Sequence, residues 1–402
     1  MIEWLRRVHP DRPFLAFDGR SWTYGEAVAE VESRITRLPR LIQPSLEPES
    51  VFDLLAGMSG GGATVIGPEP EATVAGDSDL VVFTSGSTGP PKGVRLSLLN
   101  LQAAASASAD HLGHGPDDDW LLAMPLHHVG GISILVRQAY SGGSVTLLPR
   151  FDPDDVAAAM KGRVTMVSLV PTMLARLLDR GPFSGLRAVL VGGGPIPSGL
   201  LEMAGETGIP VLPTYGMTET FGQVATLRPD SPLAYEAHPL PGVDVRIEPD
   251  GRIALRSPQI SSGYLGEPDR TDPWFVTNDI GELQDDGAIR VMGRADTMVV
   301  TGGENVSPER VEAVVRQHPE VADAVVVGVP DAVWGQMVVC LHEGGPDDLG
   351  EWVGLRLPGF MVPKRWLRVD ALPKTSIGKP DREAAARLVE QLRDRRSEPH
   401  VE

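Results

Sequence analysis

The stretch that decides the fold of this chain is Thr84-Ser85-Gly86-Ser87-Thr88-Gly89-Pro90-Pro91-Lys92-Gly93. It follows Leu80-Val81-Val82-Phe83, a continuous apolar run that suits a strand buried on both faces. Its small residues expose backbone N–H groups, its hydroxyls add donors and Lys92 adds charge, and this chemistry cradles phosphates. It is not a Walker P-loop, because Pro91 stands where that motif needs its second glycine. The sequence therefore favours a phosphate-binding loop over a merely flexible polar loop.

Further strand-then-glycine units follow this loop. Leu186 to Val191 leads into Gly192-Gly193-Gly194, and Val211-Leu212 leads into Tyr215-Gly216-Met217-Thr218. Helical patterns lie among these units, for example from Pro171 to Leu178. Alternating strands and helices predict an α/β fold with binding loops at the strand ends.

The pattern changes after residue 240. The turns Asp250-Gly251 and Asp286-Gly287 predict antiparallel hairpins. A helix that begins at Ser307-Pro308, followed by a strand from Ala324 to Val329, indicates a small α+β unit. We therefore expect a large α/β domain with an added antiparallel β part over residues 1–295, and a small α+β domain over residues 296–402.

Composition excludes several classes of function. The chain has 402 residues, 42% of them hydrophobic, which is ample for packed cores. Its formal net charge of -18 argues against a nucleic-acid or anionic-membrane binder, since both need a basic face. The N-terminus lacks the apolar core of a signal peptide, and no apolar run approaches the ~18 residues of a membrane span. The single cysteine, Cys340, is expected to be buried in a strand and fits a reducing compartment. We expect a cytoplasmic protein without membrane insertion.

Five further motifs follow the phosphate loop. They are Tyr215-Gly216-Met217-Thr218-Glu219-Thr220, Thr277-Asn278-Asp279-Ile280-Gly281, Gly293-Arg294-Ala295-Asp296, Gly302-Gly303-Glu304-Asn305 and Pro373-Lys374-Thr375-Ser376-Ile377-Gly378-Lys379. In this order they resemble the acyl-adenylate-forming superfamily of acyl-CoA synthetases, amino-acid adenylation domains and luciferases. The resemblance runs from about residue 80 to the C-terminus and implies an enzyme that activates a carboxylic acid with ATP.

The resemblance implies a role in ATP binding for several residues, and their chemistry agrees. Glu219 is a hard oxygen ligand suited to Mg²⁺ on the phosphates, and Thr218 offers a hydroxyl to the same phosphates. Asp279 suits the ribose diol, and Arg294 suits the ribose or a phosphate. Tyr215 suits stacking on adenine. The remaining residues expected to bind ATP are Thr84, Ser85, Gly86, Ser87, Thr88, Gly89, Lys92, Gly192, Gly193, Gly194 and Gly216.

Other roles are implied for the acid, for coenzyme A and for movement. Lys379 occupies the place of the family's catalytic lysine, and Asp296 that of the hinge before its small, mobile domain. Gly302 and Gly303 fall where coenzyme A is expected. His128 matches the histidine that lines the acyl channel. The expected catalytic set is Lys379, His128, Thr218 and Glu219.

Further stretches of sequence narrow the choice of carboxylic acid substrate. Amino-acid adenylation domains carry an Asp shortly after the histidine motif, and Gly131 to Arg137 contains none. No carrier-protein domain follows, so free coenzyme A is expected as the acceptor. Runs from Pro125 to Leu135, Ser168 to Leu174, Val191 to Pro197 and Glu219 to Val224 resemble the o-succinylbenzoate–CoA ligases of menaquinone biosynthesis. The sequence thus predicts an AMP-forming 2-succinylbenzoate–CoA ligase. A ligase for another aryl or short acyl acid, or a non-catalytic nucleotide-binding relative, remains as an alternative.

That acid has a second carboxylate, which Arg137 or Arg163 could meet. Polar contacts could come from Ser133, Thr172, Gln223 and Thr226. His111 and His114 form an HxxH pair without further ligands nearby and are expected at the surface. Because the phosphate loop begins as early as Thr84, we expect a trimmed N-terminal subdomain. The oligomeric state is left open.

Overall fold

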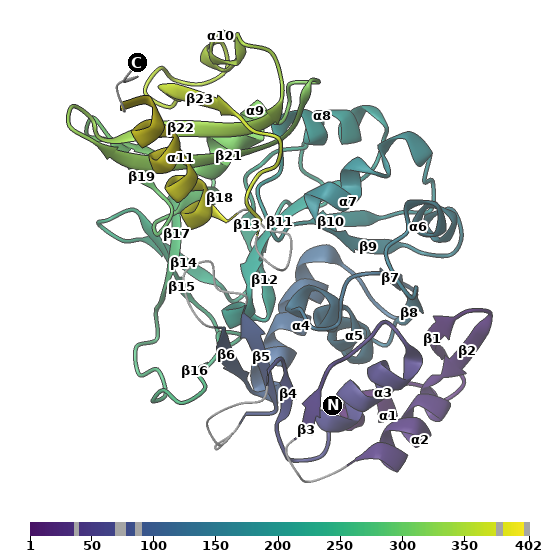
Figure 1. Cartoon of the computed structure of the whole chain (residues 1–402). Coiled ribbons are helices and arrows are strands. Elements are labelled where there is room, and N and C mark those ends of the chain that lie inside the picture. Colours follow the sequence, from purple (N-terminus) through teal and green to yellow (C-terminus); the bar gives the residue numbers. More distant parts are fainter. Residues whose placement is uncertain (36–39, 69–77, 85–90, 375–380, 398–402) are drawn as a thin grey trace.

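The computed structural model describes residues 1–35, 40–68, 78–84, 91–374 and 381–397. Within them the chain forms a large part built on three sheets and a small C-terminal part built on a fourth sheet (Figure 1). The predicted α/β class with a small C-terminal α+β unit is confirmed.

The central sheet has nine strands in the order β13-β12-β11-β10-β9-β7-β8-β1-β2. Its parallel strands are β1 (Pro13–Phe17), β7 (Asp119–Leu122), β8 (Ser144–Leu147), β9 (Met166–Leu169), β10 (Ala188–Val191) and β11 (Val211–Met217). Antiparallel strands at its edges are β2 (Arg20–Thr23), β12 (Gly222–Thr226) and β13 (His238–Pro239). Trp120 and Leu122 pack into one apolar cluster and Leu121 into another, so both faces of the sheet are buried.

Helices cover both faces of this sheet. They are α4 (Leu98–Leu112), α5 (Val129–Ser141), α6 (Pro153–Met160), α7 (Pro171–Ala175) and α8 (Ser198–Glu206). The helix predicted from Pro171 to Leu178 is shorter, since a 3-10 turn follows at Leu178–Arg180. Tyr215 to Met217 continue β11, although the sequence predicted a loop there, because they pair with β12.

The second sheet has the order β16-β6-β5-β4-β3 and carries the ends of the phosphate loop. Its strands are β3 (Arg40–Ile42), β4 (Thr64–Ile66), β5 (Leu80–Thr84), β6 (Lys92–Leu96) and β16 (Gly263–Tyr264). The predicted buried strand before the loop is confirmed as β5, and Thr84 pairs with Lys92 across to β6. The N-terminal helices beside this sheet are α1 (Ile2–Arg6), α2 (Tyr24–Arg34) and α3 (Pro48–Gly57).

The third sheet contains both predicted hairpins. Its strands are β14 (Asp244–Ile247), β15 (Arg252–Arg256), β17 (Phe275–Leu283) and β18 (Ile289–Arg294). Gly251 and Gly287 close the two turns with φ of 83° and 82°, a left-handed conformation that glycine adopts without steric cost.

The small part begins with β19 (Val299–Thr301) and has its own cores. Its further elements are β20 (Glu304–Val306), α9 (Pro308–Val315), β21 (Val321–Asp331), β22 (Gly335–Gly344), α10 (Leu349–Gly354), β23 (Arg365–Arg368) and α11 (Arg382–Ser397). Ser307 caps α9 by accepting the Arg310 N–H at 3.3 Å, as predicted. Cys340 is fully buried in β22, also as predicted.

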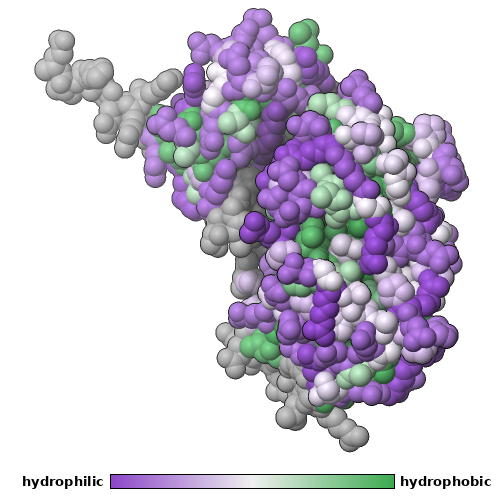
Figure 2. Space-filling view, turned by 90° about the vertical axis from the view of Figure 1, so that its right-hand side faces the viewer, coloured by the Kyte–Doolittle hydropathy of each residue, from purple (hydrophilic) through white to green (hydrophobic). Residues whose placement is uncertain are grey.

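The face of the molecule drawn in Figure 2 is mostly hydrophilic. Figure 2 shows an apolar patch near the middle of this face of the large part, with further apolar patches elsewhere on the same face. Among the described residues, no helix combines the length and the apolar character needed to span a membrane.

Candidate active site

The turn between β11 and β12 presents two of the predicted catalytic side chains. Thr218 to Thr220 form a single 3-10 turn, and Phe221 follows it with φ of 50°. Left-handed backbone costs a bulky residue of order 1–3 kcal/mol, and burial of the Phe221 ring holds it in place. A Cβ at Gly216 would overlap the carbonyl oxygen of Gly222, so only glycine fits there.

Glu219 on this turn lies next to the end of the phosphate loop. Its Oε1 accepts a 2.9 Å hydrogen bond from the Tyr264 hydroxyl. The Tyr264 ring centroid lies 4.9 Å from the Lys92 ammonium, which is also 3.9 Å from Glu267. The other Glu219 carboxylate oxygen has no partner among the described residues. Tyr264 therefore brings together two motifs that are more than 100 residues apart in sequence.

A polar chain leads from β11 to the predicted hinge. The Tyr215 hydroxyl donates to Asp279 Oδ2 at 2.7 Å, and Arg294 Nη1 lies 3.8 Å from Asp279 Oδ1. Arg294 also binds both carboxylate oxygens of Asp296, at 2.9 and 2.6 Å. Burial raises the pKa of Asp279, although the Tyr215 hydrogen bond and the Arg294 charge oppose this shift. Tyr215, predicted to stack on adenine, therefore contacts the predicted ribose residue Asp279. Asp279 in turn lies near Arg294, which binds the predicted hinge residue Asp296.

The glycine run after β10 gives this site a thin wall. A Cβ at Gly192 would lie 2.7 Å from the Thr214 Cγ2 and carbonyl oxygen of β11, so β10 and β11 approach closely here. Gly193 has φ of 77°, and a Cβ at Gly194 would meet open space. The run lies beside the strand that carries Tyr215, as expected for opposite sides of one adenine.

His128 and α5 define the expected acid side. His127 and His128 lie in a turn after β7, with ring centroids 4.3 Å apart. His128 is the N-cap residue of α5. Ser133, one turn into the helix, donates to the Gly130 carbonyl at 3.1 Å. A Cβ at Gly222 would lie 4.0 Å from the Ser133 hydroxyl, which places α5 next to the Thr218–Thr220 turn.

Arg137 lies one further turn along α5 and is only 6% exposed. Its guanidinium carbon lies 5.1 Å above the ring centroid of Trp120 in β7. Burial lowers the pKa of Arg137 to about 10. Among the described residues, none forms a hydrogen bond or an ion pair with it. Arg137 is therefore a buried cation whose contact in this structure is an aromatic face.

His114 lies beside the same tryptophan, with ring centroids 5.3 Å apart and an interplanar angle of 84°. It is 5% exposed, and neither of its ring nitrogens has a hydrogen-bond partner within the described part of the chain. Burial, with the Arg137 charge as a second cause, lowers the pKa of His114 to about 4. The expectation of a surface HxxH pair was therefore wrong: His114 is buried and His111 half-buried. No pattern in the sequence indicates this burial, because His114 follows α4 in an otherwise polar loop.

The other candidate substrate contacts have different surroundings. Gln223 and Thr226 are buried in an internal chain of hydrogen bonds that includes Ser108 and Thr214. Thr172 is exposed on α7. Arg163 is half-exposed and pairs with Asp119 at 2.7 Å. It precedes β9 and so lies at the end of the sheet opposite to the Thr218–Thr220 turn. Of the two candidate arginines, only Arg137 is buried and without an acidic partner.

Two predicted parts of the site fall outside the described residues. They are the central phosphate loop, Ser85 to Gly89, and Lys379. The predicted coenzyme A glycines are described: Gly302 and Gly303 turn between β19 and β20 with φ of 58° and 86°. A Cβ at Gly302 would lie 3.0 Å from the Trp334 ring, so glycine allows this close approach.

Comparison with known proteins agrees with this geometry. Residues 40–265 match the family model of AMP-binding enzymes, and residues 310–379 match the model of the AMP-binding enzyme C-terminal domain. This chain belongs to the AMP-binding enzyme family. The match begins at residue 40, so it extends further toward the N-terminus than the motifs alone indicated.

The relatives support the predicted branch of the family. A 2-succinylbenzoate–CoA ligase of Bacillus cereus is 37% identical over 357 residues, which are 81% of this chain and 74% of that enzyme. The o-succinylbenzoate CoA synthetase MenE from Bacillus subtilis, in complex with the acyl-adenylate intermediate OSB-AMP, superposes with a TM-score of 0.86 at 26% identity. The match covers 96% of this chain and 97% of that one. The same enzyme with ATP and a magnesium ion gives 0.85 at 27% identity, covering 94% and 98%.

Proposed function

We propose that this chain is an ATP-dependent ligase that converts 2-succinylbenzoate, through its acyl-adenylate, into 2-succinylbenzoyl-CoA for menaquinone biosynthesis. The family membership, the named relatives and the contact between the Glu219 turn and the Lys92 strand support the ATP chemistry. The observation that carries the choice of acid is the buried Arg137, which has no ion-pair partner among the described residues. We also propose a cytoplasmic location, which a lone buried cysteine suits.

The second carboxylate of 2-succinylbenzoate gives Arg137 the partner that it lacks. A buried cation without an acid partner is costly, and a carboxylate offers it charge-assisted hydrogen bonds. Ser133 and Arg137 are four residues apart on α5, about 6 Å along the helix axis. His128 caps the start of this helix, so an acid activated near His128 could extend along it toward Arg137. Acetate or a simple fatty acid would leave the guanidinium unpaired.

The surroundings of Arg137 suit an aromatic acid. Trp120 presents its ring face to the guanidinium and makes a T-shaped contact with the His114 ring. Since the pKa of His114 is lowered to about 4, its ring is neutral near pH 7 and has one N–H to donate. We propose that His114 supplies a neutral hydrogen bond, direct or through water, to the same carboxylate.

Glu219 is the proposed protein ligand for magnesium. Mg²⁺ needs few protein carboxylates because it keeps several waters, and Glu219 has one carboxylate oxygen without a partner in the described structure. When bound, the ion screens and orients the ATP phosphates. Tyr264 holds the Glu219 carboxylate in place, and Lys92 adds positive charge at the loop end. The loop from Thr84 to Gly89 is proposed to bind the phosphates.

Tyr215, Asp279 and Arg294 are proposed to hold the nucleoside. Tyr215 would stack on adenine against the Gly192–Gly194 wall, and Asp279 would accept from the ribose diol. Arg294 is bound to Asp296 here, so its proposed contact with ribose or phosphate would compete with that ion pair. Lys379 is proposed as the catalytic lysine, delivered by rotation of residues 296–402 about Asp296.

A panel of acids tests this function. The assay measures acid-dependent pyrophosphate release and CoA-thioester formation with 2-succinylbenzoate, benzoate, acetate, a fatty acid and amino acids. We expect turnover of 2-succinylbenzoate far above that of the others. Equal turnover of benzoate or a fatty acid would contradict the proposed acid, and absence of pyrophosphate release with every acid would contradict the adenylation itself.

A further inference from the structure

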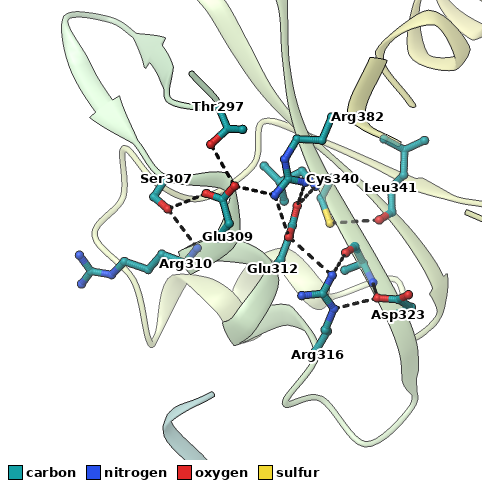
Figure 3. A network of polar contacts seen from close by, with 12 residues as sticks. Thr297, Ser307, Glu309, Arg310, Glu312, Arg316, Asp323, Cys340, Leu341 and Arg382 are labelled. Carbon is teal, nitrogen blue, oxygen red and sulfur yellow. Dashed lines mark hydrogen bonds and ion pairs between the residues drawn. The ribbon is translucent and has the colours of Figure 1, made fainter. Parts of the chain in front are cut away.

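A buried ionic network lies beside the proposed hinge and has no part in the ATP or acid sites (Figure 3). Its centre is Arg382, the first residue of α11. The Arg382 guanidinium binds Glu309 Oε1 at 2.8 Å and Glu312 Oε1 at 2.7 Å, and both acids lie on α9. Burial raises the pKa of Glu309, but the Arg382 charge and the hydrogen bonds that Glu309 accepts together hold that pKa below its usual value. An ionised Glu309 therefore fixes the start of α11 to α9.

Glu309 has another partner next to the hinge. The Thr297 hydroxyl lies 2.9 Å from Glu309 Oε1 and 3.2 Å from the Arg294 carbonyl oxygen. A hydroxyl has one hydrogen, so Thr297 donates to one of these acceptors at a time. Arg294 precedes Asp296 in the chain and Glu309 follows it. The two acceptors therefore lie on opposite sides of the proposed hinge.

The residues on either side of the segment that contains Lys379, here called the lysine segment, are held to the small C-terminal part. The Asp381 N–H donates to the Pro373 carbonyl at 2.9 Å, which joins the two ends of the segment. Lys374 Nζ lies 3.3 Å from the Asp323 carboxylate, and Asp381 caps α11 by accepting the Ala384 N–H at 2.9 Å. Asp381 is followed directly by Arg382, which is bound to α9. A movement of α9 should therefore also move the end of the lysine segment at Asp381.

Glu312 plays a different part, although it binds the same arginine. Its side chain is 3% exposed, and Oε1 accepts the Val326 N–H of β21 at 2.8 Å. Its other oxygen lies 3.5 Å from Arg316. Glu312 thus joins α9 to the sheet beneath it, and within the described part of the chain it forms no hydrogen bond or ion pair with Thr297 or Asp296. The two glutamates offer a matched pair of substitutions within one network.

We propose that Glu309 is a positioning residue for adenylation, which couples the hinge at Thr297 to the base of the lysine segment at Arg382. This rests on the proposed function. The lysine is needed while the carboxylate attacks ATP, because charge develops there, whereas thioester formation from a finished acyl-adenylate does not need it. Loss of Glu309 should therefore affect the first half-reaction and spare the second.

Separate assays of the two half-reactions test this proposal in the full-length protein. Glu309→Gln keeps the side-chain size but loses the charge, and we expect kcat for acyl-adenylate formation to fall about tenfold or more, with the KM for ATP within about twofold. Thioester formation from supplied acyl-adenylate should stay within about twofold. Thr297→Val should lower the rate of acyl-adenylate formation relative to thioester formation, as Glu309→Gln does, whereas Thr297→Ser, which keeps the hydroxyl, should behave as the parent. The double variant Glu309→Gln/Thr297→Val should be no worse than Glu309→Gln alone.

The controls separate positioning from stability. Glu312→Gln should lower the melting temperature but leave the ratio of the half-reactions unchanged. Arg387→Ala, which removes an exposed pair with Glu383 on the same helix, should change neither. Equal loss of both half-reactions in Glu309→Gln, or the same shifted ratio in Glu312→Gln, would overturn the proposal while the parent remains an active ligase. An inactive parent would overturn the proposed function and this inference together.

Discussion

The Tyr215 hydroxyl donates a 2.7 Å hydrogen bond to the Asp279 carboxylate and so joins β11 of the central sheet to β17 of the third sheet. Arg294 lies 3.8 Å from the other Asp279 oxygen and binds Asp296. One carboxylate is therefore shared between the proposed nucleoside site and the proposed hinge. A ribose diol that bound Asp279 would compete with Tyr215 and Arg294 for the oxygens of this carboxylate.

Acidification should weaken ATP binding through Asp279. Its pKa is raised above the ordinary 3.8, first of all by burial. A carboxyl with a raised pKa takes up its proton at higher pH, and the neutral form is a poorer acceptor for the ribose. The KM for ATP should therefore rise as the pH falls toward that pKa. Asp279→Asn should show a higher KM at every pH and lose this part of the pH dependence, which a pH series of initial rates would reveal. Identical pH profiles in both proteins would count against the ribose role.

Glu219→Gln should raise the magnesium requirement without unfolding the protein. A neutral amide is a weaker ligand than a carboxylate, so half-maximal pyrophosphate release should need about tenfold more Mg²⁺. Glu282→Gln, on an exposed position of β17, is the matched control and should behave as the parent. If the two variants titrate with magnesium alike, Glu219 is not the ligand.

Gly216→Ala should damage both stability and ATP turnover. The added Cβ would overlap the Gly222 backbone, which cannot move aside as a flexible side chain could. We expect a loss of roughly 2 kcal/mol or more in the free energy of unfolding, as for other incompatible glycine replacements. Gly199→Ala is the control, because a Cβ there meets no atom within 4 Å and alanine favours a helix. Equal melting temperatures for the two variants would contradict the close packing of the turn.

The half-reactions should separate at Lys379 and Asp296. Lys379→Ala should lose orders of magnitude in acyl-adenylate formation and still convert supplied acyl-adenylate to thioester. Asp296→Pro fixes φ at the hinge and should instead stall after adenylation. Assays of both steps in both variants provide the measurement. Equal depression of both steps in Lys379→Ala would remove domain rotation from the account.

Motif order was sufficient to predict the fold class, because short buried strands and glycine turns are local signals, while the ATP residues stay a prediction. The hairpins at Gly251 and Gly287 and the cap at Ser307 are of this kind. The buried state of His114 could not be predicted, since it depends on how α4, α5 and β7 pack. For the same reason the sequence could not choose between Arg137 and Arg163. The Glu309 bridge was missed because its partners Thr297 and Arg382 are 85 residues apart.

The central claim is that this ligase selects an acid with a second carboxylate, which Arg137 binds. Its most direct test compares kcat/KM for CoA-thioester formation from 2-succinylbenzoate and from the same acid without its ring carboxylate, in the parent, Arg137→Met and Arg163→Gln. The parent should prefer 2-succinylbenzoate, and Arg137→Met should lose about 10- to 150-fold of that preference, the worth of one charge-assisted hydrogen bond at roughly 1.5–3 kcal/mol. It should fold normally, since an apolar replacement removes a buried cation. Arg163→Gln should keep the parent's preference. A parent that uses both acids equally, or an Arg137→Met variant that still prefers 2-succinylbenzoate, would contradict the account.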